Sequence, residues 1–275
     1  MVVQHNLTAM NSNRMLGVTT STQAKSTEKL SSGYKINRAA DDAAGLAISE
    51  KMRRQVRGLT QAVANAQDGI SAVQTAEGAL GEVHDMLQRM NELAVKAGTD
   101  TLQETDRAYI QAEVDALTTE INRVSATTTF NEQALLDGTF TGKKLQVGAE
   151  SDGSNQIAMS IASMNFNGLA GQNSISVTGV SGANARASIA VVKKALEAVS
   201  KQRSDLGAIQ NRLEHTVKNL DNVVENTQAA ESQIRDTDMA TEMVRYSNNN
   251  VLAQAGQSML AQANQSNQGV LSLLR

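Results

Sequence analysis

The sequence of 275 residues contains no cysteine, no proline and no tryptophan, and its aromatic fraction is only 2%. The absence of cysteine excludes disulfides and thiol chemistry, although it does not fix the compartment. Proline interrupts helices, so its absence permits long ones. A large globular core usually relies on aromatic bulk, and the scarcity of aromatic residues therefore argues against such a core.

An excess of charge of either sign is also missing, since 25 Lys and Arg face 28 Asp and Glu. The net charge of −3 gives no basic footprint, so we expect no nucleic-acid partner. No apolar run reaches the length of a membrane span, so no membrane insertion is expected. The N-terminus has no secretory signal pattern. We therefore expect a cytosolic protein, or one that leaves the cell by a route without a cleaved leader.

Both ends of the chain are almost empty of charge. Residues 246–274 contain no Asp, Glu, Lys or Arg, and the first 24 residues carry only Arg14. Their apolar residues have helical spacing. An isolated helix of this kind is only marginally stable, and it needs a partner against which to bury its apolar face. We predict amphipathic terminal helices that become ordered against other copies of the chain. The residues expected to be buried in this self-assembly are Leu7, Met10, Val251, Leu252, Met259, Leu260, Leu271 and Leu274.

The C-terminal half has the clearest helical pattern. Apolar residues alternate three and four positions apart through residues 189–224, with polar interruptions at Arg203 and Gln210. A helix from about Ala187 to Thr227 would be roughly 60 Å long. That length favours a coiled-coil partner over an ordinary core.

A second heptad pattern within the same chain could supply that partner. It extends through residues 48–73 and, after a slip near Ala76, through residues 80–94, and Gly98 then ends it. Thr101 and Glu104 are expected to form a capping box for a shorter antiparallel helix, with its stripe in residues 110–124.

The segment from 130 to 186 has a different pattern. Residues 145–147 and 157–161 alternate on either side of Asp152-Gly153, which predicts a β-hairpin. A Gly/Ser/Asn-rich loop is expected from about residue 165 to 184. The predicted fold class is mainly α, a long antiparallel helical bundle or coiled coil with a small β-hairpin and amphipathic terminal helices.

Two long segments carry a resemblance to a known family. The segment that starts at Leu30 reads LSSGYKINRAADDAAGLAISEKMRRQVRGLTQAVANAQDGISAVQTAEGAL and resembles the N-terminal signature of bacterial flagellin. The segment that starts at Glu231 reads ESQIRDTDMATEMVRYSNNNVLAQAGQSMLAQANQSNQGVLSLLR and resembles the C-terminal signature. The resemblance covers roughly residues 1–142 and 186–275.

This resemblance implies a structural protein that is exported unfolded by the flagellar type III apparatus and polymerises into a hollow extracellular filament. The implied partners are other copies of the chain, a flagellar export chaperone and a cap protein. The implied division is an N-terminal inner-core helix and connector, N-terminal outer-core helices, a hairpin and loop, a C-terminal outer-core helix, and a C-terminal inner-core helix. These parts correspond to residues 1–44, 45–130, 131–185, 186–230 and 231–275. Larger members carry additional domains in the middle, so this chain is expected to form a thin, smooth filament.

The resemblance also implies a receptor contact. Residues 88–95, QRMNELAV, match the segment through which flagellins of this type engage Toll-like receptor 5, and residues 110–113, IQAE, match the acidic contact on the next helix. The contacts carried over are Gln88, Arg89, Leu93 and Glu113. An exposed arginine beside an aliphatic residue suits a binding hot spot. The alternative is that Arg89 and Glu113 form a solvated pair and that Leu93 is a packing residue.

Residue patterns that carry chemistry are few. His5, His84 and His215 lie far apart and predict no metal site. Residues 236–242 hint at a calcium loop but lack the glycine and spacing of an EF-hand, so helix capping is expected there and at residues 41–42. No phosphate loop or nucleophile elbow is present, so neither an enzyme nor a cofactor is expected.

Two alternatives to a filament subunit remain open. A hook–filament junction protein would share the helical ends. A cytoplasmic signalling coiled coil belongs to a different class and would need no special termini.

Overall fold

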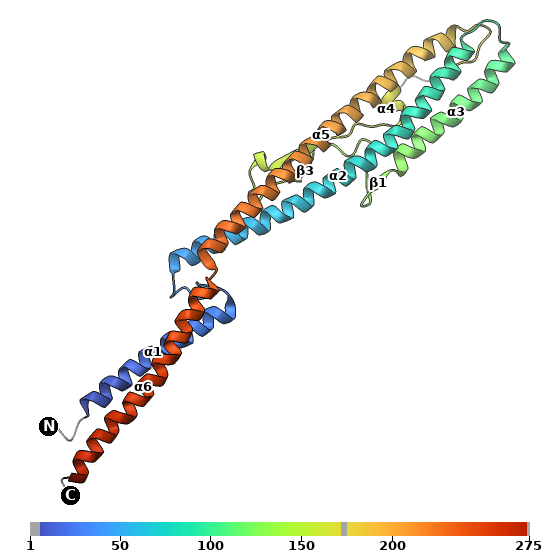
Figure 1. The fold of residues 1–275 in the computed structure, drawn as a ribbon. Coiled ribbons are helices and arrows are strands. Elements are labelled where there is room, and N and C mark those ends of the chain that lie inside the picture. Colours follow the sequence, from blue (N-terminus) through green and yellow to red (C-terminus); the bar gives the residue numbers. More distant parts are fainter. Residues whose placement is uncertain (1–5, 172–174, 274–275) are drawn as a thin grey trace. The chain divides into compact units, whose positions relative to one another are not determined.

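The computed structural model describes residues 6–171 and 175–273, and of residues 267–273 it describes the backbone alone. The helices are α1 Leu7–Ser32, α2 Ala43–Ala97, α3 Glu104–Thr127, α4 Phe166–Ala170, α5 Ala183–Arg235 and α6 Met239–Leu273 (Figure 1). β1 Thr129–Phe130 pairs with β2 Gln133–Ala134, and β3 Lys143–Gln146 pairs with β4 Gln156–Met159, both antiparallel. The mainly α fold with a small β-hairpin is confirmed.

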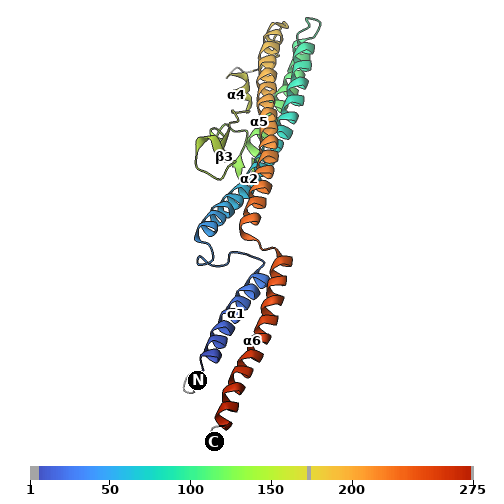
Figure 2. The same ribbon diagram turned by 60° about the vertical axis from the view of Figure 1, so that its left-hand side comes forward.

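The chain divides into two compact units. Unit 1 contains residues 1–56 and 225–275, and unit 2 contains residues 57–224. In unit 2, α2, α3 and α5 run side by side, as both views of the ribbon show (Figures 1 and 2). α2 and α5 are antiparallel within this bundle, which confirms the prediction that the long C-terminal helix finds its partner in the same chain.

The buried seam of α2 is one uninterrupted heptad pattern. Ala62, Ala66, Gly69 and Val73 are buried, and the same alternate spacing continues through Ala76. It then runs to the end of the helix through Leu80, Val83, Leu87, Met90, Ala94 and Ala97. The slip predicted near Ala76 was therefore wrong.

The error had a physical cause. Val63 and Ile70 are the bulky residues at the positions where the predicted repeat places its seam, but they are only partly buried, whereas Ala62 and Gly69 face inward. The hairpin of β3 and β4 packs against α2 at Gly69. Leu145 of β3 lies so close that a Cβ on Gly69 would be 2.5 Å from Leu145 Cδ1.

α5 shows the same displacement. Its buried positions include Ser188, Ala195 and Gln202, one residue before those predicted. The polar interruptions expected at Arg203 and Gln210 lie at the margin of the seam: Arg203 reaches Glu77 across the bundle at 3.7 Å, and Gln210 donates to Glu214. The helix also continues to Arg235, beyond the end predicted near residue 227.

The middle segment contributes more to the core than a surface loop would. Leu135, Leu136, Ile161 and Val177 are fully buried within unit 2. Side chains of the helices bind the backbone of this segment, because it has few strand partners of its own. Gln111 accepts from Val177 N–H at 2.7 Å, Asn122 accepts from Phe166 N–H at 2.9 Å, and Ser125 donates to the Leu136 carbonyl at 2.9 Å.

The turns differ in part from prediction. Asp152-Gly153 does not form a two-residue turn, because β3 and β4 are joined by a longer connection containing the 3₁₀ turn η1 Gly153–Asn155. The tight turn lies between β1 and β2, where Asn131 and Glu132 have φ of 49° and 62°. Asparagine tolerates this left-handed conformation better than most residues, so Asn131 suits the first position of the turn.

Helix starts are capped mostly as expected. Asp42 accepts from Gly45 N–H at 2.9 Å at the start of α2, and Asp238 accepts from Ala240 N–H at 3.0 Å at the start of α6. The capping box expected from Thr101 and Glu104 was wrong. The N-cap of α3 is Gln103, two residues later than predicted, and the capping box is formed by Gln103 and Asp106, whose carboxylate accepts from Gln103 N–H at 3.1 Å.

A short joint in unit 1 connects the residues after α1 with those between α5 and α6. Lys35 N–H donates to the Arg235 carbonyl at 2.7 Å, and Thr237 N–H donates to the Gly33 carbonyl at 2.9 Å. The Arg235 guanidinium lies 4.7 Å from the centroid of the Tyr34 ring. Within the described parts of the chain, no helix combines the length and apolarity that crossing a bilayer requires.

Candidate functional site

α1 and α6 lie side by side in unit 1 and are called here the end-helix pair (Figure 2). Small residues form the contact between them. Ala253 is buried, and a Cβ on Gly256 would lie 3.3 Å from Leu16 Cδ1. Asn6 joins the two helices by donating to the Ala263 carbonyl at 3.0 Å. Because small residues occupy this contact, the pair buries little of its larger apolar side chains.

Most of the residues predicted for self-assembly are exposed on this pair. Leu7 is 71% exposed, and Met10, Val251 and Met259 are each 63% exposed. Leu252 is also exposed, whereas Leu260 is partly buried. For Leu271 the structure describes the backbone alone, and Leu274 lies outside the described residues. The structure thus brings the described members of this set onto one helix pair, on which every described side chain of the set except that of Leu260 is exposed.

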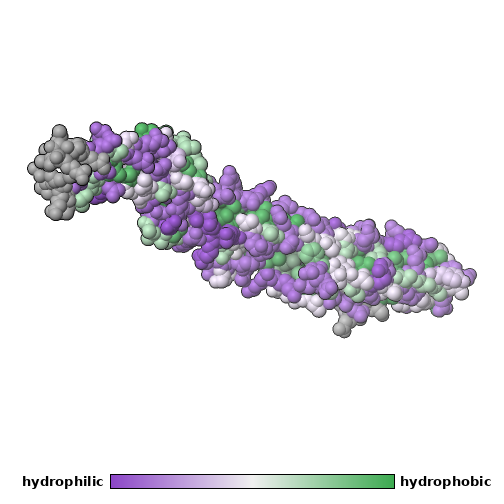
Figure 3. Space-filling view, turned by 90° about the horizontal axis from the view of Figure 1, so that it is seen from below, coloured by the Kyte–Doolittle hydropathy of each residue, from purple (hydrophilic) through white to green (hydrophobic). Residues whose placement is uncertain are grey.

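An open apolar groove runs between the two helices. It is lined by Asn11, Ser12, Met15, Leu16 and Thr19 from α1 and by Leu252, Ala255, Gly256 and Met259 from α6. None of these side chains carries a charge. In Figure 3, hydrophobic patches interrupt the hydrophilic surface close to the grey residues of the chain ends. A groove of this composition can bind apolar side chains but offers no acid, base or metal ligand.

The residues considered for a calcium loop have other roles. Asp238 accepts from the Thr241 hydroxyl at 2.7 Å, and this bond, followed by bonds from backbone N–H groups, lowers the pKa of Asp238. Glu242 is buried beside Arg245 at 3.6 Å. Among the described residues, no group of three His, Cys, Asp or Glu side chains is arranged to hold a metal ion.

The receptor residues carried over by resemblance meet on α2 and α3. Arg89, Glu92 and Glu113 form the Arg89 cluster, in which Arg89 Nε donates to Glu113 Oε1 at 2.9 Å and Nη1 donates to Glu92 Oε2 at 3.1 Å. The bond to Glu113, followed by the bond to Glu92, raises the pKa of Arg89. Gln88 lies beside the cluster, with Nε2 at 2.8 Å from His84 Nε2.

Leu93 differs from its polar neighbours because it is only 3% exposed. It forms part of the floor of a shallow groove between α2 and α3, and Leu102, Tyr109 and Glu113 are also in the lining. Tyr109 is 78% exposed. Sequence reasoning missed both Glu92 and Tyr109, although each lies three or four residues from a predicted contact on the same helix, where side chains become neighbours.

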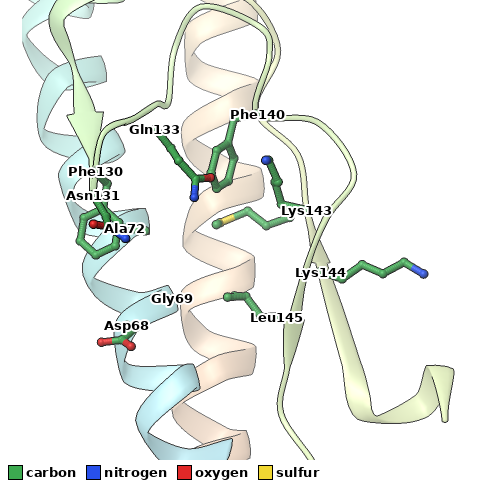
Figure 4. Close-up of a pocket in the computed structure, with 11 residues that line it drawn as sticks. Asp68, Gly69, Ala72, Phe130, Asn131, Gln133, Phe140, Lys143, Lys144 and Leu145 are labelled. Atoms are coloured by element: carbon green, nitrogen blue, oxygen red, sulfur yellow. The ribbon is translucent and has the colours of Figure 1, made fainter. Parts of the chain in front are cut away.

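A further pocket lies where the hairpins meet α2 (Figure 4). Phe130, Phe140 and Leu145 supply apolar walls, and Asp68 is the acidic residue of the lining. Lys143 extends toward Phe140, with Nζ 5.8 Å from the ring centroid, whereas Lys144 points away from the pocket. The lining contains no pair of carboxylates and no nucleophile beside a base, so its geometry gives no basis for catalysis.

Comparisons with known proteins agree with this architecture. Residues 3–141 match the family model of the bacterial flagellin N-terminal helical region, and residues 189–274 match that of the C-terminal helical region. A flagellin of Halalkalibacterium halodurans is 53% identical over 277 residues, and the match covers all of both chains. The flagellar filament 31.3 kDa core protein of Treponema maltophilum is 48% identical over 288 residues, again across all of both chains.

A solved structure of a putative flagellar hook-associated protein from Vibrio parahaemolyticus has a similar fold. The match covers 71% of this chain and 100% of that one, with a TM-score of 0.61 and 13% sequence identity. At this identity the likeness shows the fold alone.

Proposed function

Since the chain belongs to the bacterial flagellin family and is a structural subunit of the external flagellar filament, we propose that the end-helix pair is its main polymerisation surface. The observation that carries this proposal is the set of exposed apolar residues in the parts of α1 and α6 toward the chain ends, where Arg14 is the one charged residue of residues 7–24 and 246–273. The proposed contacts are Leu7, Met10, Val251, Leu252, Met259, Leu260, Leu271 and Leu274.

Energetics support this assignment. Burying one large aliphatic side chain contributes roughly 1.5–3 kcal/mol, and every subunit repeats the same contacts. Contacts between unlike faces propagate without closing, which produces an open helical tube. In the free subunit, the end helices bury too little apolar surface to offset the entropy of ordering them. We therefore propose that α1 and α6 are helical in the filament, as in this structure, and that the same two segments are disordered in the free subunit.

Seeded polymerisation of the purified chain, followed by electron microscopy, tests the proposal. The double variant Val251→Asp and Leu252→Asp should fail to form filaments, because two charges would be buried at each contact. Val180→Asp is the matched control, since Val180 is 87% exposed in unit 2 and lies outside the proposed surface. Normal polymerisation of the double variant would refute the assignment.

A junction role is the second candidate, because the fold of the hook-associated protein is similar. The filament role is favoured by full-length identity of 53% to a flagellin. Polymerisation also separates the candidates: a filament subunit alone forms long filaments on a seed, whereas a junction protein forms a short cap on it. We propose no enzymatic activity and no cofactor for this chain.

By analogy with the family, we also propose export through the flagellar type III apparatus, with an export chaperone and a cap protein as partners. Deleting the export apparatus from the host should leave the chain inside the cell, where immunoblots of cell and medium fractions would find it. Secretion that continues at the normal level would exclude this route.

We further propose that Toll-like receptor 5 binds the free subunit through Gln88, Arg89, Leu93 and Glu113. Arg89 and Glu113 are about half exposed and present paired charge, and Leu93 supports them from beneath. The proposal rests on the exposure of this pair together with the sequence resemblance.

Receptor signalling by purified subunits tests the contact. Arg89→Ala should reduce potency about tenfold, as expected for loss of a hot-spot residue worth more than 1 kcal/mol. Arg123→Ala is the control, because Arg123 is also exposed on a helix of unit 2 and also pairs with a nearby glutamate, Glu120, at 2.8 Å. Equal potency of the two variants would count against the assignment.

A further inference from the structure

The methionines are distributed unevenly between the two units. Five described methionines on the end-helix pair are about half exposed or more: Met10 63%, Met15 54%, Met239 48%, Met243 57% and Met259 63%. In unit 2, Met90, Met159 and Met164 are at most 3% exposed, and Met86 is partly buried against the core. Accessible thioether sulfur is thus concentrated on the helices that we propose to be buried by neighbouring subunits.

Methionine suits such a surface because its flexible side chain adapts to irregular gaps. It also introduces a chemical liability that leucine or valine would not. The sulfur lone pair attacks one oxygen of hydrogen peroxide, the O–O bond breaks, and the proton of the attacked oxygen passes to the departing hydroxide, so that the thioether becomes a sulfoxide and the peroxide is reduced to water. The product is polar and chiral where the side chain had been apolar.

We propose that Met10, Met15, Met239, Met243 and Met259 are modification sites at which hydroperoxide oxidants block polymerisation of the free subunit. This inference rests on the proposed role of the end-helix pair in polymerisation. Once the subunit is in the filament, the same sulfurs are covered by its neighbours. Susceptibility is therefore confined to the free subunit, before it assembles.

The local composition explains why a sulfoxide would be harmful here. A sulfoxide oxygen needs a hydrogen-bond donor when buried, and burial without one is unfavourable. Residues 246–274 contain no Lys or Arg and the first 24 residues contain only Arg14, so the side-chain donors near Met10, Met15 and Met259 in the sequence are mostly neutral amides and hydroxyls, which bind more weakly than charged donors. Met15 and Met259 both line the groove between α1 and α6 together with Leu16 and Leu252, so sulfoxides there would place two polar oxygens among the apolar side chains that a neighbouring subunit is proposed to cover.

The test treats free full-length subunits with hydrogen peroxide, maps sulfoxides by peptide mass spectrometry, and measures the critical concentration for seeded polymerisation. We expect sulfoxides at the five positions, little at Met90, Met159 and Met164, and a critical concentration at least tenfold higher. Subsequent treatment with methionine sulfoxide reductases should restore the original critical concentration, because these enzymes reverse this oxidation alone.

Matched variants show which sulfurs matter, each protein being compared with its own untreated sample. Peroxide should change the critical concentration less than twofold when all five methionines are replaced by leucine. A variant carrying Met52→Leu and Met86→Leu, which alters partly buried methionines outside the pair, should remain as sensitive as the original chain.

Three results would overturn the inference: full oxidation at the five positions with unchanged polymerisation, equal peroxide sensitivity of the five-leucine variant, or failure of the reductases to restore assembly. Each would leave the polymerisation surface intact, because that surface is tested without oxidant by the aspartate substitutions at Val251 and Leu252.

Discussion

Arg107 is a fully buried charged residue in unit 2, and its guanidinium binds four backbone carbonyls. It donates to Ala97 and Thr99 at 3.1 and 2.8 Å, and to Gly179 and Val180 at 3.0 and 3.2 Å. The first two follow or end α2, and the last two precede α5, so one side chain joins both connections at the end of the bundle. A planar group with five donors can make this set of bonds, which a lysine cannot.

Replacing Arg107 should therefore destabilise the chain substantially. Arg107→Met removes the donors of one buried and three part-buried carbonyls and should lower the free energy of unfolding by about 3 kcal/mol. Urea denaturation at neutral pH measures the effect. Arg186→Met is the control, since Arg186 is more than half exposed and should cost less than about 1 kcal/mol. Similar losses for both variants would contradict the role assigned to Arg107.

Asp100 makes the stability of the end of the bundle next to Arg107 depend on pH. Its carboxylate accepts from Gly182 N–H at 2.8 Å, and this bond, followed by the charge of Arg186, lowers the pKa of Asp100. A lowered folded-state pKa means that the stabilisation is complete above the ordinary carboxyl value of about 4 and is lost as pH falls through the folded value.

We therefore expect Asp100→Ala to lower the urea midpoint at pH 7, with the difference from the original chain shrinking toward pH 2. Asp205→Ala changes an exposed aspartate on α5 and should leave the midpoint unchanged at both values. A deficit for Asp100→Ala that is as large at pH 2 as at pH 7 would rule out the charged carboxylate as its source.

At the scale of elements, the sequence predicts which helices form better than which residues face inward. The extent of α2 followed from its heptads and from Gly98, and the terminal helices α1 and α6 followed from the helical spacing of the apolar residues near both chain ends. The sequence did not predict that the small residues Ala62 and Gly69 occupy positions in the buried seam, because bulky residues such as Ile70 are expected to face inward. The hairpin decides that orientation, and its packing against Gly69 is a tertiary contact invisible to helical periodicity.

The candidate site divides in the same way. Pairing of Arg89 with Glu113 could be anticipated, because the matching segments lie on consecutive antiparallel helices. The burial of Leu93 agrees with the alternative in which it is a packing residue, although the QRMNELAV pattern alone does not distinguish a groove floor from an exposed contact. Arg107 was missed, although a charge three residues before Ile110 falls on the apolar stripe of α3 and was a signal.

A pair of glycine substitutions in α2 tests the seam. Gly78→Ala meets nothing within 4 Å and should raise the free energy of unfolding by about 0.5–1 kcal/mol through helix propensity. Gly69→Ala should lower it by about 1 kcal/mol, because the new Cβ would lie 2.5 Å from Leu145 Cδ1. Urea denaturation compares the two, and equal stabilisation by both would show that the hairpin does not pack as described.

At the scale of the whole molecule, the two units differ in what they can bury alone. Unit 2 has a continuous core in which α2, α3, α5 and the middle segment share fully buried residues. Unit 1 has little comparable core along α1 and α6, where large apolar residues face outward. In such a subunit, we expect that unit 2 can fold on its own, whereas α1 and α6 become ordered only when neighbouring subunits bind.

Hydrogen exchange followed by mass spectrometry, on free subunits and on filaments of the same chain, tests this division most directly. In free subunits the peptides of α1 and α6 should exchange within seconds, whereas the seam peptides of α2 and α5 in unit 2 should exchange slowly. In filaments all of these peptides should be protected. Slow exchange of α1 and α6 in free, monomeric subunits, matching that of unit 2, would contradict the claim that neighbouring subunits order the ends of the chain.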